Sequence, residues 1–184
     1  MRIPIVVTRQ YPRWIYYPNS HEPPEWVSGV VRVFHSKREI LDSRKAHKKS
    51  NVVLDIVRAE LEKLGFEVEG GAIGRLQRPV HFGEYGEADR RYQIDSYHAE
   101  SRIALEVEAG RTTRGNAIYR DIIQTSLLVG IRYFVLAVPQ VYKFKAAGKE
   151  ISDSTYEMCK SIFDAIYSSE QLRLPMEGIL LIGY

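Results

Sequence analysis

The sequence predicts an α/β (α+β) fold in which helices flank a central mixed β-sheet. Three patterns indicate this: helical spacing of apolar residues from Ser50, an apolar and acidic alternation over 103–108, and a fully apolar run over 133–138. They are typical of an amphipathic helix, of a strand with one apolar face, and of a central strand covered on both faces. Residues 50–138 are therefore expected to run helix, strand, strand, strand, helix, strand.

The boundaries of these elements follow from capping residues and from glycine and proline. Ser50 and Asn51 are good helix caps, and Gly65 ends the same apolar spacing. The stretch 70–91 is rich in glycine and charge, which favours a loop or an irregular hairpin. The predicted elements are a helix from Ser50 to Gly65, strands over 66–69, 92–95 and 103–108, a helix over 116–129, and a strand over 133–138 that ends at Pro139.

Outside this core, the pattern of apolar residues predicts secondary structure less clearly at the beginning of the chain than at its end. Residues 1–28 mix aromatic residues with prolines, which suits irregular structure, and Val30 to Phe34 is interpreted as a strand. A third helix is predicted over 158–167 and a last apolar strand over 178–182.

Length and composition predict one domain over residues 1–184, because 184 residues with 45% hydrophobic content bury a sizeable core. It divides into an aromatic and basic extension (1–49), a core (50–138) and a C-terminal helix and strand (139–184). The lone Cys159 excludes an intramolecular disulfide and a zinc site built from several thiolates of one chain. No signal peptide and no membrane-length apolar run is found, so we expect a soluble, cytoplasmic protein without a membrane partner.

Charge is distributed unevenly along the chain. The formal net charge is only +3, yet residues 32–49 hold seven Lys and Arg residues against Glu39 and Asp42, with His35 and His47 between them. Such a stretch either contacts a polyanion or forms a solvated charged face, and the second is the commoner case.

Three acids, Asp95, Glu106 and Glu108, form the candidate site. Side chains alternate along a strand, so Glu106 and Glu108 share a face with Ala104. If residues 97–102 close a hairpin, one allowed register sets Asp95 directly opposite Glu106. Carboxylates this close repel unless a cation lies between them or one keeps its proton, and oxygen ligands suit Mg²⁺ or Mn²⁺. The alternative is that the glutamates line the solvent face of an edge hairpin.

A fourth candidate acid, Glu60, projects from within the apolar arc of the first predicted helix. A buried carboxylate needs a partner such as a metal-bound water, Arg or Lys. Alternatively, Glu60 lies at the margin of the arc and reaches solvent.

Nucleic-acid contacts are expected from polar and basic residues near these acids. Arg75 and Arg78 lie in the loop before Asp95, where they either contact phosphates or keep the loop soluble. Asn116, Arg120 and Gln124 follow at helical spacing and form one stripe, which either contacts a phosphate and a water or faces solvent.

The order of elements, together with these acids, resembles the core of the PD-(D/E)XK nucleases, the restriction-endonuclease-like superfamily. Asp95 matches the first acid of that motif, and Glu106-Val107-Glu108 matches the acid-x-lysine tripeptide with glutamate in the lysine position. Glu60 resembles the extra helix-borne acid of some members. The resemblance covers about half of the chain.

The resemblance implies a Mg²⁺-dependent endonuclease that hydrolyses DNA phosphodiester bonds, most like a restriction enzyme, acting as a homodimer. Asp95, Glu106 and the Val107 carbonyl are then expected to hold Mg²⁺, for which Mn²⁺ substitutes. Glu108 acts as the base or holds a second metal. Arg111 and Arg114 lie just past the strand, where Arg111 either stabilises the phosphate or forms a structural salt bridge.

Other functions fit parts of the pattern. A repair or recombination nuclease of the same fold uses the same acids on branched DNA. A catalytically inactive module keeps the fold and binds nucleic acid without metal. A glycosidase also uses two carboxylates, but acids on one strand suit the separation of about 5–5.5 Å in a retaining site only in some rotamers.

Overall fold

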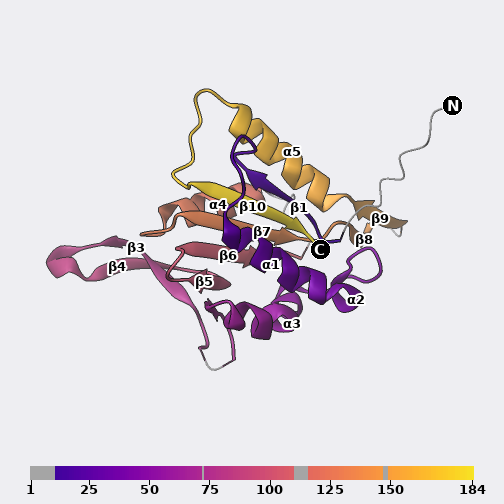
Figure 1. Ribbon diagram of the computed structural model, residues 1–184, viewed down its shortest axis with the longest axis horizontal. Helices are drawn as coiled ribbons and strands as arrows, with labels where there is room; N and C mark the ends of the chain where they lie inside the picture. Colours follow the sequence, from indigo (N-terminus) through magenta and orange to yellow (C-terminus); the bar gives the residue numbers. More distant parts are fainter. Residues whose placement is uncertain (1–10, 72, 110–115, 147–148) are drawn as a thin grey trace.

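A six-stranded mixed β-sheet forms the centre of the structure (Figure 1). The computed structural model describes residues 11–71, 73–109, 116–146 and 149–184. The strands of the sheet are β1 (Arg13–Tyr17), β2 (Phe66–Val68), β5 (Ser96–His98), β6 (Ile103–Val107), β7 (Tyr133–Val138) and β10 (Gly178–Gly183). They lie in the order β1-β10-β7-β6-β5-β2. β10, β7 and β6 run parallel, while β1, β5 and β2 pair antiparallel with their neighbours.

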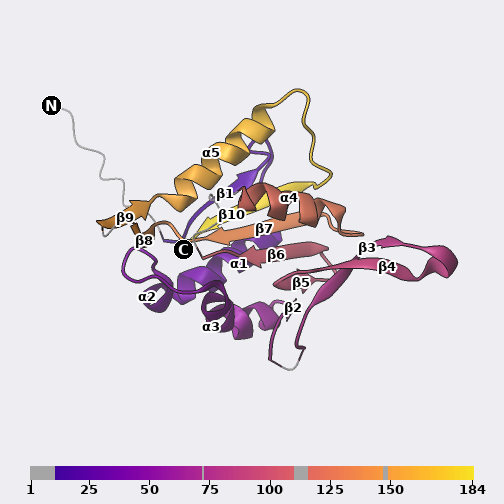
Figure 2. The same ribbon diagram turned by 180° about the vertical axis from the view of Figure 1, so that it is seen from behind.

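Helices cover both faces of this sheet, which confirms the predicted fold class. The helices are α1 (Glu25–Ser36), α2 (Arg38–Leu41), α3 (Ser50–Lys63), α4 (Ala117–Leu127) and α5 (Thr155–Ser168). Figures 1 and 2 show α1, α2 and α3 on one side of the sheet and α4 and α5 on the other. No described helix combines the length and the apolar character that crossing a bilayer requires.

The alternation of side chains along β6 divides the core into two sides. Ile103, Leu105 and Val107 pack into the apolar cluster with residues of α1 and α3. Ala104 belongs to a small cluster on the other side, with Leu128 at the end of α4. Because neighbouring side chains of a strand point to opposite faces, the residues of β6 that share a face with Ala104 lie on the side of α4.

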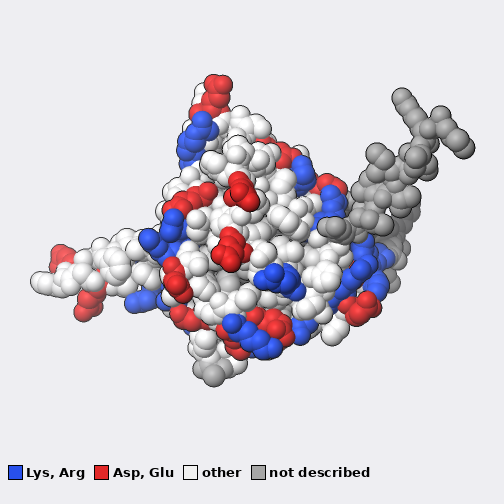
Figure 3. Space-filling model, viewed as in Figure 1, with Lys and Arg blue, Asp and Glu red and all other residues white. Residues whose placement is uncertain are grey.

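Two additional hairpins extend from the sheet. β3 (Gln77–Phe82) and β4 (Ala88–Gln93) pair antiparallel around a short 3₁₀ turn, η1 (Glu84–Gly86), and form an arm that projects from the body (Figures 1 and 2). Tyr85 in the turn is 97% exposed, and Figure 3 shows acidic side chains near the outer end of the arm. The second hairpin consists of β8 (Tyr142–Ala146) and β9 (Lys149–Asp153).

Most predicted elements are confirmed, but the interpretation of Val30 to Phe34 as a strand is wrong. These residues lie in α1, whose buried residues Val27, Val30, Val33 and Phe34 recur at helical spacing. Valine favours strands in general, yet here the three- and four-residue repeat of the apolar positions decides the structure. The segment 1–28, expected to be irregular with short extended pieces, also contains the edge strand β1.

The strand predicted over 92–95 is corrected as well. Tyr92 and Gln93 end β4 in the arm, and Asp95 lies in a bend just before β5. Because β5 occupies residues 96–98, the turn that joins it to β6 is shorter than the predicted break over 97–102. The stretch 70–91 does form an irregular hairpin, with register shifts near His81.

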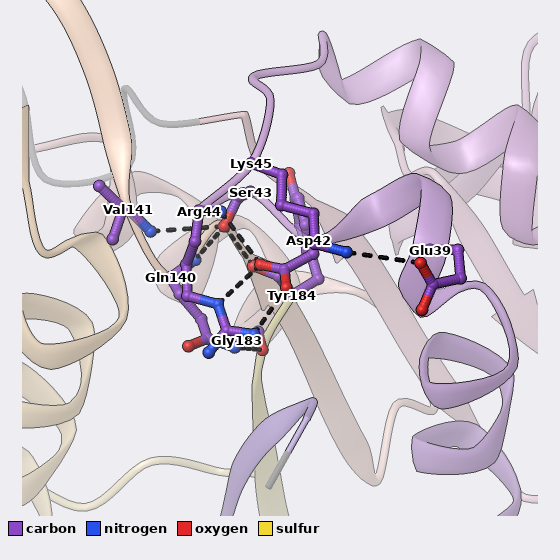
Figure 4. A network of polar contacts seen from close by, with 9 residues as sticks. All are labelled: Glu39, Asp42, Ser43, Arg44, Lys45, Gln140, Val141, Gly183 and Tyr184. Carbon is purple, nitrogen blue, oxygen red and sulfur yellow. Dashed lines mark hydrogen bonds and ion pairs between the residues drawn. The ribbon is translucent and has the colours of Figure 1, made fainter. Parts of the chain in front are cut away.

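A buried polar network ties the loop after α2 to the end of β10 (Figure 4). The Ser43 hydroxyl donates a hydrogen bond to the Tyr184 carbonyl and accepts one from the Gln140 backbone N–H at 2.9 Å. The Gln140 side chain donates to the Gly183 carbonyl at 3.0 Å. Ser43 is buried, so this loop, which carries part of the basic stretch, has a fixed path along the sheet.

We expect Ser43→Ala to lower the free energy of unfolding by about 1–2 kcal/mol, because it removes a buried hydroxyl that bonds both the Tyr184 carbonyl and the Gln140 N–H, which keep only their bond to each other at 2.8 Å. Urea denaturation measures the change. The matched control is Lys45→Ala in the same loop, which removes only an exposed ion pair with Glu39 and should cost less than about 1 kcal/mol. Equal effects of the two substitutions contradict the role given to Ser43.

Candidate active site

The three predicted acids come together where β5 and β6 meet. Ser96 lies opposite Leu105 in the antiparallel pair, so continuing the register by one residue sets Asp95 opposite Glu106. Glu108 follows β6 directly, and its backbone N–H donates to the Ala137 carbonyl at 2.8 Å. The hairpin register proposed from the sequence is therefore the one that the structure adopts.

Asp95 is held in place by the backbone of the strands around it. Its Oδ2 accepts a hydrogen bond from the Val107 N–H at 2.7 Å, and its carbonyl accepts one from the Glu69 N–H at 2.8 Å. The N–H and C=O of one strand residue point to the same side, so the Val107 carbonyl also faces Asp95. Burial raises the pKa of Asp95 to about 6, although the Val107 N–H opposes this rise.

Glu106 has the most unfavourable electrostatic position of the group. Burial raises its pKa well above the usual value, and the carboxylates of Asp95, Asp121 and Glu108 raise it further. A side-chain hydrogen bond with Asp95 adds to the rise in the pKa of Glu106. Two carboxyl groups this close favour the form in which one of them keeps its proton.

Glu108 is positioned by its backbone on two sides. The Tyr184 hydroxyl donates to the Glu108 carbonyl at 2.6 Å, in addition to the contact of its N–H with β7. Burial and then the nearby Asp121 raise the pKa of Glu108 to about 7, while Arg120 lowers it. A side-chain hydrogen bond with Asp121 contributes to the raised pKa of Glu108.

Asp121 is a fourth acid of the site that the sequence reasoning missed. It lies on α4, is only 7% exposed, and faces Glu106 and Glu108 from the helix that covers their side of the sheet. A signal was present, because Asp121 falls between the buried Ile118 and Ile122 on the apolar stripe of α4. An acid inside such a stripe is the same signal that selected Glu60.

Arg120 is the cation nearest to these acids among the described residues. Its Nη2 lies 2.9 Å from Asp121 Oδ1 and 3.9 Å from Glu108 Oε1. The guanidinium group is largely exposed and lies beside the outer acids, and no other described cation lies within ion-pair distance of Asp95 or Glu106. The predicted position of Arg120 beside the site is thus observed, with acids as its present partners.

The residues fit a hard divalent cation by their chemistry. The acid cluster, defined as Asp95, Glu106, Glu108 and Asp121, offers several carboxylate oxygens, the donors that Mg²⁺ and Mn²⁺ prefer. Within the described residues, Asp121 Oδ2 is buried and has no hydrogen-bond partner. In the same part of the chain no three His, Cys, Asp or Glu side chains are already arranged to hold a metal. Binding of a cation to the acid cluster would therefore require these side chains to move closer together.

Glu60 is not brought to the acid cluster. Its carboxylate pairs with Lys63 at 3.2 Å and with Lys37 at 3.5 Å, and these lysines lower its pKa. It lies on α3, whereas Glu106 faces the opposite side of the sheet. Lys37 and Lys63 are therefore the partners that the Glu60 carboxylate needs on this helix. The role of Glu60 in the site stays a prediction.

The residues expected to contact nucleic acid are spread over several environments. Arg78 pairs with Glu67 at 2.7 Å and lies over the Tyr97 ring, while Arg75 is exposed. Asn116 caps α4 and is exposed together with Gln124, as a solvent-facing stripe requires. Arg111 and Arg114 lie outside the described residues.

One comparison with known proteins identifies a family. The family model described as "Putative halobacteria restriction endonuclease" matches residues 5–184. No curated protein matches the chain. The match extends over nearly the whole chain, including all four members of the acid cluster.

Because the buried carboxyl groups of the cluster repel one another when ionised, we expect Glu106→Gln to be more stable than the wild type in metal-free buffer, by an amount that depends on pH. The unfolded chain ionises Glu106 near pH 4.5, whereas the folded protein holds the proton to a higher pH. A raised pKa in the folded state means that wild-type stability falls as the pH rises above about 4.5. At pH 8 the variant should be more stable than the wild type, and at pH 4 the two should differ little.

Urea denaturation in EDTA at both pH values measures this difference. The control is Glu177→Gln, whose carboxylate is bound by Arg132 with its pKa lowered, so neutralising it should give no gain at pH 8. If the Glu106→Gln variant is less stable than the wild type at pH 8, the ionised cluster does not destabilise the fold and this account is contradicted.

Proposed function

The chain belongs to the family of putative halobacteria restriction endonucleases, and from that premise we propose that it is a metal-dependent endonuclease that hydrolyses DNA phosphodiester bonds. The observation that carries the proposal is the acid cluster. Four carboxyl groups lie near one another in a mostly buried position, and burial raises the pKa of three of them, Asp95, Glu106 and Glu108. Burying these carboxyl groups together lowers the stability of the fold, and a role in binding a catalytic metal explains why the protein keeps them.

Asp95, Glu106 and the Val107 carbonyl would hold the metal, and Mg²⁺ is proposed, with Mn²⁺ as its substitute. When bound, the cation would polarise the phosphate and lower the pKa of the attacking water. The Val107 N–H fixes Asp95 by its hydrogen bond to Oδ2, so the orientation of this ligand is set before metal arrives. Asp121 either completes the ligand set or keeps Glu108 in place through their shared hydrogen bond.

Glu108 is the group that takes the proton of the attacking water. Its pKa of about 7 in the metal-free protein suits a general base that works near neutral pH. Hydrogen bonds with Tyr184 and β7 fix the backbone of Glu108, so the position from which its side chain extends at the end of β6 is fixed too. Arg120 lies 3.9 Å from Glu108 and favours its ionised form.

The substrate, assembly and compartment are proposals of the same kind. Membership of the family supports DNA as the substrate and restriction as the role. We also propose a homodimer that acts on the two strands, in the cytoplasm. Sedimentation of the purified protein tests the dimer, and a monomer at all concentrations contradicts it.

A catalytically inactive nucleic-acid-binding module is the second candidate. Two observations favour it: glutamate stands at 108 in place of the usual lysine, and within the described residues no group of acids is ready to hold a metal. A structure-specific repair or recombination nuclease is the third, and it differs from the first only in its substrate.

Cleavage of plasmid and of branched DNA with Mg²⁺ or Mn²⁺ tests these candidates. The wild type should produce discrete linear fragments, and EDTA, Asp95→Asn or Glu106→Gln should reduce the rate by at least about 10²-fold, because each removes a ligand of the proposed metal. Cutting at branches alone supports the repair enzyme. A wild type that cuts neither substrate and is not stabilised by Mn²⁺ supports the inactive module.

We further expect Glu60→Gln to keep cleavage within a few-fold of the wild type, since Glu60 pairs with Lys37 and Lys63 and not with the acid cluster. The same plasmid assay measures it, with Glu106→Gln as the inactive reference. A loss as large as that of Glu106→Gln would return Glu60 to the catalytic groups.

A further inference from the structure

A cleft opens beside Glu108, on the side of the loop that follows α2. Its volume is about 450 Å³. It lies between the end of β6, the beginning of β8 and the beginning of α3. The residues that line it are His47, Lys49, Ser50, Asn51, Glu108, Ala109 and Tyr142.

Two residues of opposite charge line this cleft. They are Glu108, an acid of the cluster, and Lys49. Lys49 immediately precedes the 14-residue helix α3, so the partial positive charge of the helix N-terminus adds to that of Lys49. The cleft thus holds a cationic residue together with the proposed general base.

Some cations of the basic stretch have an acid partner, and others, Lys49 among them, have none in the described residues. Arg44 is bound by Asp42 at 2.6 Å, Lys45 lies 3.4 Å from Glu39, and Lys37 is paired with Glu60. Among the described residues, no carboxylate lies within ion-pair distance of Lys49, which is exposed. A lysine left unpaired in a cleft beside catalytic acids is free to bind an anion.

The walls of the cleft are tied to one residue. The Tyr184 hydroxyl donates to the carbonyl of Glu108, and its own carbonyl accepts the Ser43 hydroxyl from the loop that leads to Lys49. His47 of this loop also packs edge-on against the Tyr142 ring, with centroids 5.1 Å apart. These contacts connect both Glu108 and the loop that leads to Lys49 to the core of the protein.

We propose that Lys49 supplies the cation that the Glu-x-Glu motif lacks, by binding a non-bridging oxygen of the scissile phosphate in this cleft. The inference rests on the proposed function. A water oxygen bonds to phosphorus, its proton passes to Glu108, and the bond from phosphorus to the leaving sugar oxygen breaks. Solvent water protonates that oxygen, and Lys49 stays charged while it balances the negative charge that gathers on the phosphate.

The test compares Lys49→Ala, Lys49→Arg and Lys48→Ala in single-turnover cleavage at saturating protein and metal. Lys48 adjoins Lys49 but does not line the cleft, so its variant changes the net charge equally. We expect Lys49→Ala to slow the saturated rate by about 10²-fold, as loss of one preorganised donor does. Lys49→Arg should recover most of the rate, and Lys48→Ala should cleave like the wild type.

DNA affinity separates catalysis from simple charge attraction. It is measured by fluorescence anisotropy with Lys49→Ala and Lys48→Ala placed on the uncleaving Glu106→Gln background, and both should weaken binding by a similar few-fold factor. Urea denaturation checks that each variant is folded.

Two results overturn the assignment of Lys49. One is a saturated rate of Lys49→Ala equal to that of Lys48→Ala, and the other is a loss of affinity with an unchanged saturated rate. In both cases the wild type still cleaves, so the proposed function survives. A wild type that neither cleaves DNA nor is stabilised by Mn²⁺ overturns the proposed function, and the role of Lys49 fails with it.

Discussion

The mutual repulsion of buried carboxyl groups is the constraint on which the candidate site depends. Asp95 and Glu106 lie opposite each other across β5 and β6, and α4 brings Asp121 against the same face. Burial is the first cause of the raised pKa of Asp95, Glu106 and Glu108, and their neighbours add to it. In the absence of a cation such a group keeps protons or loses stability. The fold therefore holds an arrangement that only a positively charged ligand fully satisfies.

The central parallel strands make this arrangement possible. β7 and β10 are almost wholly buried, and β6 pairs with β7, so β6 lies between the two helical layers. Tyr184, which follows β10, contacts both Glu108 and Ser43, so the acid cluster and the basic loop are joined through one residue. Glu108 and Lys49, which come from the two ends of this connection, line one cleft.

The sequence predicted those features that depend on local periodicity. The alternation over 103–108 correctly placed Glu106 on the face opposite to Leu105, and the apolar run 133–138 identified the central strand. The prediction for Val30 to Phe34 was wrong, because the valines suggested a strand whereas the helical spacing of the apolar residues decides the structure. The helical stripe of α4 marked Asp121 as unusual, but its place beside Glu106 and Glu108 comes from the packing of α4 over β6, which local periodicity does not report. Glu60 gave the same helical signal as Asp121, and tertiary contacts with Lys37 and Lys63 separate the two.

Calorimetric titration of Mn²⁺ tests the central claim, that the acid cluster is a cation site held closed by protons. The titration is run on the wild type and on Glu106→Gln at pH 7, in two buffers that differ in their enthalpy of protonation. We expect the wild type to bind Mn²⁺ and release protons, because the shared protons of the cluster must leave, and the variant to bind much more weakly. Absence of binding by the wild type, or equal binding by the variant, contradicts the claim.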